Sequence, residues 1–348
     1  MNAPLRLGFI GIGAMGLSHV KQFHVKQAAR ARAVAVCSRN DANIRKALEV
    51  APDARVFRDE RELIHSDLDA VVISSPNSTH AALARETLAS GKHLFLEKPV
   101  GVTREECASV LAAAEKSDRV VLIGHELRYS AFFQKMKALV DAGDIGTPRM
   151  VWTREFRGPF QPKSGQWIQD DRMSGGMMVD KNCHHFDIMN WWVGARPKRV
   201  AAFGGTAVNR VIDGPHQVND HSTVSFEYAN GVRGTLQICL FARDFPHEDL
   251  EMGIVGDAGM LQTRISTIEI LQWKRGSGQG EPIAHQVAAR GGEGWGNHLG
   301  FDEIHAAFLD AVLDGKRPLT TVPDCVDGTL LAIAAEESIR SRQIVEIV

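Results

Sequence analysis

The sequence predicts an α/β protein whose N-terminal part is a doubly wound parallel sheet. The chain has 348 residues, more than one hydrophobic core usually accommodates, which favours two domains. Up to residue 124, short apolar runs alternate with helical patterns, as in parallel α/β sheets. Further on, strands of alternating polarity are separated by hairpin signals such as Asn230-Gly231. We therefore expect a first domain over residues 1–124 and a second over 125–348.

The composition argues against several classes of protein. Hydrophobic residues make up 44% of the chain and charged residues 24%, and the formal net charge is −2, which does not suit nucleic-acid binding, a membrane surface or disorder. No apolar run approaches the ~18 residues of a membrane span, and the N-terminus lacks a signal-peptide pattern. The five cysteines contain no CxxC pair and fit reduced thiols. We expect a cytoplasmic protein with no nucleic-acid or membrane partner.

The first element is a strand that leads into a glycine-rich turn. Leu5–Ile10 reads as a buried strand, and it is followed by GIGAMG at residues 11–16 and a helical stretch. In this context GxGxxG is the signature of a Rossmann dinucleotide site, where the glycines permit a tight turn, approach of a pyrophosphate and close helix packing. A glycine turn without a ligand is the alternative. The residues expected to contact the cofactor are Gly11, Gly13, Ala14, Met15 and Gly16.

The end of the second strand, Ala33–Cys37, bears on the choice between NAD and NADP. An NAD site usually places Asp or Glu there to bind the ribose hydroxyls. This chain has Ser38 and Arg39 instead, which avoid repelling a 2′-phosphate and can pair with it. NAD stays the alternative, because Asp41 is close and an arginine here can also stack on adenine. We expect NADP as the preferred cofactor.

Two further strand ends supply polar side chains to the same edge of the sheet. The strand at residues 69–74 is followed by SPNSTH at 75–80, and such strand ends line the ligand crevice of a doubly wound sheet. The strand His93–Leu96 ends in Glu97-Lys98-Pro99, where the proline restrains the lysine backbone. Ordinary capping of the next helix is the alternative for the first group. The residues of 75–80 expected at the cofactor are Ser75, Pro76, Asn77 and His80.

The stretch GGMMVDKNCHHFD at residues 175–187 contains a pattern typical of acid–base catalysis. In a helix, Asp180, His184 and Asp187 share one face, and a carboxylate one turn before a histidine can orient the ring and hold its pKa near neutrality. Such a pair suits a general acid/base acting on an alcohol or carbonyl. The paired glycines indicate a close backbone approach to a ligand or a strand. Two alternatives are a buried histidine with a structural partner and a metal site from Asp180, Cys183, His184 and His185.

In combination, these motifs resemble the glucose–fructose oxidoreductase/inositol dehydrogenase (Gfo/Idh/MocA) family. GIGAMG, PNSTH at 76–80, EKP at 97–99 and the paired glycines followed by Asp180, His184 and Asp187 stand in the family's order. HELRYS at 125–130 is a weaker landmark, and the resemblance covers essentially the whole chain. It implies an N-terminal Rossmann domain, a C-terminal α/β domain with an open, mostly antiparallel sheet, and a site in the cleft between them.

The resemblance also implies roles for individual residues. Glu97 and Lys98 are expected at the cofactor, Arg128 of HELRYS at the substrate, and the bond between Lys98 and Pro99 is expected to be cis. The chain departs from the family in reading DKNCHH where many members have a small residue and one histidine. His185 is therefore expected to pack or to bond a neighbouring loop. The residues that match the family's catalytic trio are Lys98, Asp180 and His184.

Two loops of the second domain carry side chains suited to a sugar. The loop Phe156–Arg172 contains Trp167, and an indole stacks on the C–H face of a sugar ring while amide side chains bond its hydroxyls. Closure of the loop over the core is the alternative for Trp167. In the glycine-rich loop Gly291–Phe301, His298 is placed to reach the cleft. The residues expected to bind the substrate are Lys98, Arg128, Trp167, Asp180, His184 and His298.

We expect an NAD(P)-dependent oxidoreductase that transfers a hydride between the nicotinamide and a carbohydrate, inositol or related polyol, with no metal. His184 would take the hydroxyl proton, Lys98 would stabilise charge on the same oxygen, and Asp180 would orient His184. A nearby nicotinamide cation would lower the pKa of Lys98 and let it share the base role. The alternatives are a glycosidase with tightly bound NAD that acts by transient oxidation, and a non-catalytic dinucleotide-sensing regulator. The resemblance implies a homodimer or homotetramer formed through the second sheet.

Overall fold

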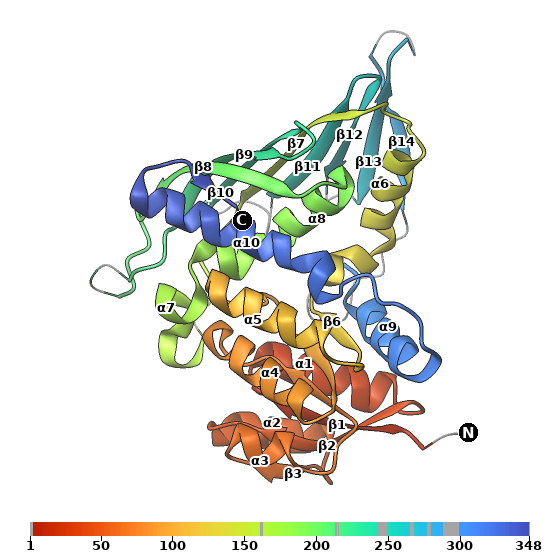
Figure 1. The fold of residues 1–348 in the computed structure, drawn as a ribbon, viewed down its shortest axis with the longest axis vertical. Coiled ribbons are helices and arrows are strands. Elements are labelled where there is room, and N and C mark those ends of the chain that lie inside the picture. The colour runs from red at the N-terminus through yellow and green to blue at the C-terminus, as the bar shows by residue number, and fades with distance from the viewer. Residues whose placement is uncertain are drawn as a thin grey trace.

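Two β-sheets organise the chain in the computed structural model (Figure 1). The structure describes residues 3–160, 163–212, 214, 216–242, 249–264, 268–276, 280–287 and 299–347. One sheet has six strands, all parallel, and the other has nine strands and is mixed. This architecture confirms the predicted fold class, including the doubly wound parallel sheet.

The parallel sheet has the strand order β3-β2-β1-β4-β5-β6, which reverses direction between β1 and β4. A doubly wound sheet binds its ligand at this crossover. The central strands are buried on both faces, which explains uninterrupted apolar runs such as AVVI in β4. The strands are β1 (Leu5–Ile10), β2 (Ala31–Cys37), β3 (Arg55–Phe57), β4 (Ala70–Ile73), β5 (His93–Leu96) and β6 (Val121–Ile123). The helices between them are α1 (Ala14–Lys21), η1 (Gln22–Lys26), α2 (Asp41–Val50), α3 (Glu60–Ile64), η2 (Asn77–Thr79), α4 (His80–Ala89) and α5 (Arg104–Glu115).

The second sheet has the order β14-β13-β12-β11-β7-β10-β9-β8-β15. Among the described strands of this sheet, only β7 and β10 pair in parallel, as expected for an open, mostly antiparallel sheet. Along β9, Val224 and Phe226 are buried while Thr223 and Ser225 are exposed, so one face is covered. The strands are β7 (Pro148–Phe156), β8 (Pro197–Gly205), β9 (His221–Tyr228), β10 (Arg233–Cys239), β11 (Asp249–Gly256), β12 (Gly259–Arg264), β13 (Glu269–Lys274), β14 (Ile283–Gln286) and β15 (Val345–Glu346).

Helices cover the face of the second sheet that is turned toward the first one (Figure 1). The long helix α10 packs against β8 and α8 on one side and against α5 on the other, so it lies between the two halves of the molecule. The helices and short helical turns of this part are η3 (Glu126–Tyr129), α6 (Ala131–Asp141), η4 (Ser164–Gln169), α7 (Asp171–Ser174), η5 (Met178–Asn182), α8 (Cys183–Val193), α9 (Phe301–Asp314) and α10 (Val322–Ser341).

Helix α9 returns to the first sheet although it lies late in the sequence. Its Ile304 and Phe308 belong to the apolar cluster formed by β1 and its neighbours. The ring of Phe308 lies 5.9 Å from that of Phe23 and 5.7 Å from that of Phe95. The division of the chain at residues 124 and 125 stays a prediction, because this C-terminal helix shares the N-terminal core.

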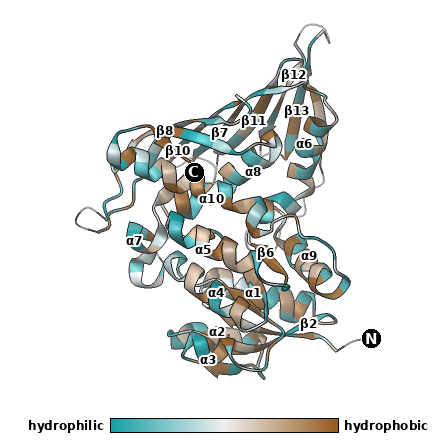
Figure 2. Ribbon diagram, in the orientation of Figure 1, coloured by the Kyte–Doolittle hydropathy of each residue, from teal (hydrophilic) through white to brown (hydrophobic). Residues whose placement is uncertain are grey.

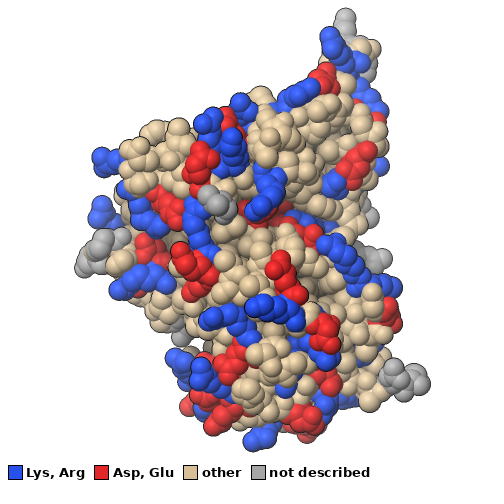
Figure 3. All heavy atoms as spheres, viewed as in Figure 1, with Lys and Arg blue, Asp and Glu red and all other residues tan. Residues whose placement is uncertain are grey.

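The surface mixes polar and apolar residues and both signs of charge. Helices α9 and α10 carry hydrophilic and hydrophobic residues side by side (Figure 2). Basic and acidic side chains are interspersed on the face shown in Figure 3, consistent with a net charge of −2. Among the described residues, every helix falls short of the length or the hydropathy that crossing a bilayer requires.

Candidate functional site

The glycine-rich turn after β1 has the shape that a dinucleotide requires. Gly11 has φ +86°, and a Cβ there would lie 2.5 Å from the backbone nitrogen of Ser75. A Cβ on Gly16 would collide with the carbonyl oxygen of Gly11, so the helix is close to the strand because this residue has no side chain. Gly13 caps α1 without a side-chain bond and faces open space. The first amides of α1 are therefore accessible to a pyrophosphate, and the residues present fit this group.

Two guanidinium groups stand at the end of β2, where sequence analysis identified one. The Arg39 side chain is 84% exposed and pairs with Glu60 at 3.2 Å. Arg58 donates a hydrogen bond of 3.1 Å to the backbone oxygen of Ser38 and pairs with Asp41. Arg58 follows β3 rather than β2, and the sequence offered no local signal for its position.

The loop at residues 75–80 is bonded mainly to other parts of the protein. Both ring nitrogens of buried His80 face carbonyl oxygens, that of Pro99 at 2.8 Å and that of Ser75 at 3.0 Å. Asn77, 3% exposed, donates to the backbone oxygen of Ser174 at 2.8 Å and to the Asp180 carboxylate at 3.0 Å. These two side chains link loops to each other, so their contact with a cofactor stays a prediction. Neither performs the helix capping given as the alternative.

Glu97 contacts α1, the helix that follows the glycine-rich turn. Its carboxylate lies 2.9 Å from Nε2 of His19 in α1, and Nδ1 of His19 lies 2.8 Å from Nε2 of His305 in α9. Burial opposes ionisation of Glu97, but His19 outweighs it, so the pKa of this carboxyl lies below its ordinary value. The sequence did not reveal this buried chain, because its members come from α1, the end of β5 and α9.

Lys98 reaches across from the first sheet to the helix of the second. The bond between Lys98 and Pro99 is cis, as expected. The ammonium Nζ donates a hydrogen bond of 2.7 Å to the backbone oxygen of Asp180. Burial disfavours the ammonium, but the neighbouring charges, Asp180 first, outweigh it and raise the pKa of Lys98 above its ordinary value. The protein's own charges thus oppose the lowered pKa that Lys98 would need to share the role of base with His184.

Asp180 has a buried, ionised carboxylate that interacts with the neighbouring lysines and with Asn77. Burial alone would raise its pKa, but Lys163, Lys98 and the hydrogen bond from Asn77 lower the pKa to about 2. The residue lies in the π-helical turn η5, and the α-helix begins only at Cys183. Asp180 and His184 therefore do not stand one turn apart on a continuous α-helix. No hydrogen bond between them exists among the described side chains, so the expected orienting role of Asp180 is not seen.

His184 lies in α8 and is 7% exposed. Its Nδ1 is 3.6 Å from Oε2 of Glu126, and the ring of His125 meets its ring edge-on at 5.4 Å between centroids. Burial, followed by the charges of Lys98 and His125, holds the pKa of His184 well below its ordinary value. At neutral pH the imidazole is therefore uncharged and can accept a proton.

Arg128 requires a correction, because its guanidinium is occupied by the protein. Nε and Nη2 each donate a 2.7 Å hydrogen bond to the carboxylate of Asp187 in α8. The remaining bonds go to the backbone oxygens of Leu319 and Asp324. Both partners of the pair are buried, at 4% and 1% exposed. The pair fastens η3 to α8, and Arg128 is not available to a substrate in this arrangement.

The loop before α7 brings a lysine and an indole toward Asp180. Nζ of Lys163 lies 4.5 Å from the ring centroid of half-buried Trp167. Packing around the ammonium lowers the pKa of Lys163, although the charge of Asp180 opposes that shift. The charges of Lys163 and Asp180 act on each other, so Lys163 lies near Asp180, where sequence analysis had expected Trp167 alone of this loop. His298 lies outside the described residues.

Two family models match the chain. Residues 5–125 match the oxidoreductase family with an NAD-binding Rossmann fold, and residues 133–262 match the GFO/IDH/MocA C-terminal domain. The chain belongs to the GFO/IDH/MocA family of oxidoreductases. This finding confirms the resemblance drawn from the motifs.

Relatives of this family cover almost the whole chain. Inositol 2-dehydrogenase of Burkholderia multivorans is 26% identical over 343 residues, which are 97% of this chain and 94% of the relative. An oxidoreductase domain protein from Kribbella flavida has a TM-score of 0.87 at 22% identity, with 100% of both chains covered. Levoglucosan dehydrogenase in complex with NADH and levoglucosan has a TM-score of 0.86 at 21% identity, covering 99% of this chain and 100% of that one. These structures share the fold.

Two further clusters of polar side chains each contain a carboxylate that is paired with an arginine. Two groups of potential metal ligands occur among the described residues, His125–Asp187–Cys325 and Asp170–Asp171–His216. Asp187 is paired with Arg128, and Asp170 is paired with Arg172. Neither group corresponds to the metal alternative weighed for residues 180–185. His185 instead lies 3.0 Å from Nδ2 of Asn182 and 3.7 Å from Glu155 of β7.

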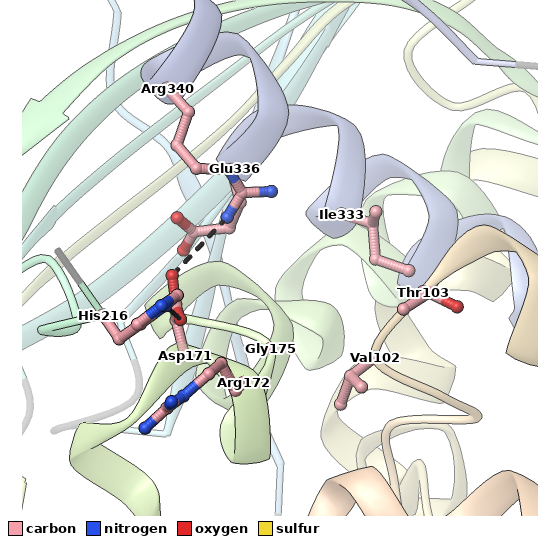
Figure 4. Close-up of a pocket in the computed structure, with 9 residues that line it drawn as sticks. All are labelled: Val102, Thr103, Asp171, Arg172, Gly175, His216, Ile333, Glu336 and Arg340. Carbon is pink, nitrogen blue, oxygen red and sulfur yellow. Dashed lines mark hydrogen bonds and ion pairs between the residues drawn. The ribbon is translucent and has the colours of Figure 1, made fainter.

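A cavity of about 310 Å³ lies between α7, the start of α5 and α10, and neither Lys98 nor His184 is among the residues that line it (Figure 4). His216 and Arg340 point toward Asp171 on one side of it. On its wall, Glu336 of α10 accepts a 2.9 Å hydrogen bond from the backbone nitrogen of Met178. A Cβ on Gly176 would lie 2.6 Å from Cδ of Glu336. For Gly176 the predicted close approach is therefore to a helix side chain, that of Glu336.

Glu336 should make stability depend on pH. Burial raises its pKa to about 7, although the bond from Met178 opposes the shift. The folded protein then keeps a proton that the unfolded chain releases near its ordinary pKa of 4.5. The free energy of unfolding should fall between about pH 4.5 and 7, by roughly 3 kcal/mol from this group alone. Urea unfolding of the wild type and Glu336→Gln at several pH values should show a flatter profile for the variant. Parallel profiles would contradict this assignment.

Proposed function

We propose that this oxidoreductase transfers a hydride between a nicotinamide dinucleotide and a carbon of a carbohydrate, inositol or related polyol. The observation that carries the proposal is the meeting of Lys98, from the end of β5, with the helix that holds Asp180 and His184. Lys98 donates to the backbone of Asp180 at 2.7 Å, and its charge acts on the buried ring of His184. A fixed cation and a neutral base next to a dinucleotide fold are the groups that alcohol oxidation needs.

The chain's own residues would share the work as follows. The bound nicotinamide supplies the carbon that accepts the hydride, or donates it in the reverse direction. His184 takes the hydroxyl proton while the hydride leaves the carbon that bears the hydroxyl, so the alcohol loses one proton and one hydride, which carries two electrons, and becomes a carbonyl. The ammonium of Lys98 donates a hydrogen bond to the oxygen as its charge develops. Asp180 keeps Lys98 protonated and in place.

The sugar or polyol class is supported by the loop at the cleft and by the relatives. Trp167 with Lys163 offers an aromatic face and a cationic donor near Asp180, a combination suited to a ring with hydroxyls. Relatives of this chain bear the names inositol 2-dehydrogenase and levoglucosan dehydrogenase. No contact among the described residues favours the glycosidase or the regulator, so both enter only as outcomes of the test.

Lys98→Ala and His184→Ala should each lower turnover of a polyol substrate by ~10²-fold or more, because each removes a group that acts on the reacting oxygen. Dinucleotide affinity should stay near that of the wild type. The measurement is the absorbance of reduced nicotinamide with a panel containing myo-inositol and levoglucosan, with His216→Ala as a control histidine outside the site.

The assignment fails if both variants turn over the substrate at the rate of the wild type. Cleavage of a glycoside without accumulation of reduced cofactor would favour the glycosidase. Dinucleotide binding without turnover of any tested polyol would favour the regulator.

We further propose NADP as the preferred dinucleotide. The support is the pair of guanidiniums, Arg39 and Arg58, at the end of β2, where a carboxylate would select NAD. Arg39→Ala should weaken NADP binding by about 10-fold or more while NAD binding changes little, since it removes a charged hydrogen bond to a phosphate. Calorimetric titration with both dinucleotides checks this, with Arg61→Ala as an exposed control arginine. Equal losses for the two dinucleotides would refute the preference.

We also propose a homodimer or homotetramer formed through the uncovered face of the second sheet. Phe203 in β8 is 81% exposed and Met150 in β7 is 52% exposed, while their strand neighbours Val200 and Val151 are buried on the helix side. Phe203→Lys should reduce the mass measured by light scattering, whereas Val25→Lys, in η1 of the first domain, should not. A monomeric wild type would contradict the proposal.

A further inference from the structure

The ring of His184 lacks the hydrogen bond that a working base needs on its inner nitrogen. Nδ1 is buried and bonds to none of the described residues at hydrogen-bond distance. A buried ring nitrogen without a partner is costly, and its tautomer is then undefined. If Nδ1 carries the proton, the lone pair at Nε2 is free to receive a proton from a substrate. The identity of the group opposite Nδ1 therefore decides whether His184 can act.

The carboxylate opposite Nδ1 belongs to Glu126. Its Oε2 is 3.6 Å away, and both side chains are less than a tenth exposed. This distance is slightly longer than a hydrogen bond, as is common for catalytic pairs before the substrate is bound. Asp180 is not a competitor, because its carboxylate is bonded to Asn77 and held between Lys98 and Lys163.

The backbone around Glu126 is fixed relative to His184. Glu126 opens the short helix η3, and Arg128, two residues later, is bonded twice to Asp187. Asp187 lies three residues after His184 on α8, so this buried ion pair sets η3 against the same turn of α8. On its other side the His184 ring meets the edge of His125. The approach of Glu126 to His184 is thus held by bonds on both elements.

The charges around His184 make the carboxylate of Glu126 important for the basicity of the His184 ring. Four groups disfavour the imidazolium: Lys98 from the end of β5, His125 just before η3, Lys181 from η5 and His185 from α8. Glu126 faces the ring from η3 with the opposite charge. A charge-assisted bond from Nδ1 to this carboxylate would stabilise the imidazolium formed when Nε2 takes the substrate proton.

We propose that Glu126 is the positioning residue for His184: its carboxylate accepts a hydrogen bond from Nδ1–H, fixes the tautomer with the lone pair on Nε2 and stabilises the imidazolium. This inference rests on the proposed function, since it assigns the orienting role within the same site. No bond to carbon is made or broken by Glu126. The substrate proton moves to Nε2, and the Nδ1 proton stays between His184 and Glu126.

The test uses two variants that separate charge from hydrogen bonding. Glu126→Gln keeps an acceptor but loses the charge, and Glu126→Leu loses both. The nitrogen chemical shifts of the His184 imidazole, measured by NMR on the free protein, report the tautomer. We expect the Nδ1–H form in the wild type and in Glu126→Gln, and a loss of that preference in Glu126→Leu. Circular dichroism and dinucleotide affinity verify that each variant folds. If Glu126→Leu does not fold, the kinetics of Glu126→Gln decide the inference.

Kinetics with whichever of myo-inositol or levoglucosan is oxidised give the second measurement. Glu126→Gln should lower kcat by about 10-fold or more with little change in KM, and should move the acid limb of the pH profile down by about one unit. Asp171→Asn, which changes a carboxylate outside the site, should leave the position of that limb unchanged. An unchanged tautomer in Glu126→Leu, or an unchanged profile in Glu126→Gln, overturns the inference while the proposed function stands. A wild type that oxidises neither compound counts against the proposed function, and the NMR result then decides the inference alone.

Discussion

The hydrogen bond from Lys98 to the backbone oxygen of Asp180 joins the two halves of this protein at the site. It connects the end of β5 in the parallel sheet to the turn η5, which directly precedes α8. Asn77 adds a second connection from the end of β4 to the side chain of Asp180. Because Asp180 is ionised and buried, the charge of Lys98 and the hydrogen bond from Asn77 to its carboxylate compensate for its desolvation. The same contacts that stabilise the interface therefore fix the groups proposed to carry out the chemistry.

The opposite side of that turn is held from α10. Glu336 receives the amide of Met178, and Gly176 makes room for its side chain. The segment before His184 is thus clamped between the first sheet and α10. The π-helical turn η5 lies within this clamp, and π-type turns often occur where a helix is adapted to a functional site. The clamp explains why Asp180 turns toward Lys98 and Asn77 rather than toward His184.

Local patterns in the sequence were enough for the parallel sheet and the glycine-rich turn, which depend on short motifs whose steric reasons act within a few residues. The cis bond before Pro99 was expected from the family resemblance alone. Contacts between distant segments could not be predicted in this way. Glu126 faces His184 because Arg128 bonds Asp187, and no spacing in the sequence reveals that pair. The same reason applies to other long-range contacts, namely those of Arg58, of Lys163 and of the chain from Glu97 through His19 to His305, which local patterns do not predict.

The roles suggested by helical spacing needed the greatest revision. A regular α-helix would align Asp180 with His184, but the π-helical turn and the pull of nearby lysines change the partner. The central claim is that Lys98 and His184 converge on one hydroxyl beside the dinucleotide. A crystal structure with a bound dinucleotide and polyol tests it most directly. The account predicts Nζ of Lys98 and Nε2 of His184 both within about 2.6–3.2 Å of the same hydroxyl oxygen. Side chains directed away from that oxygen would contradict it.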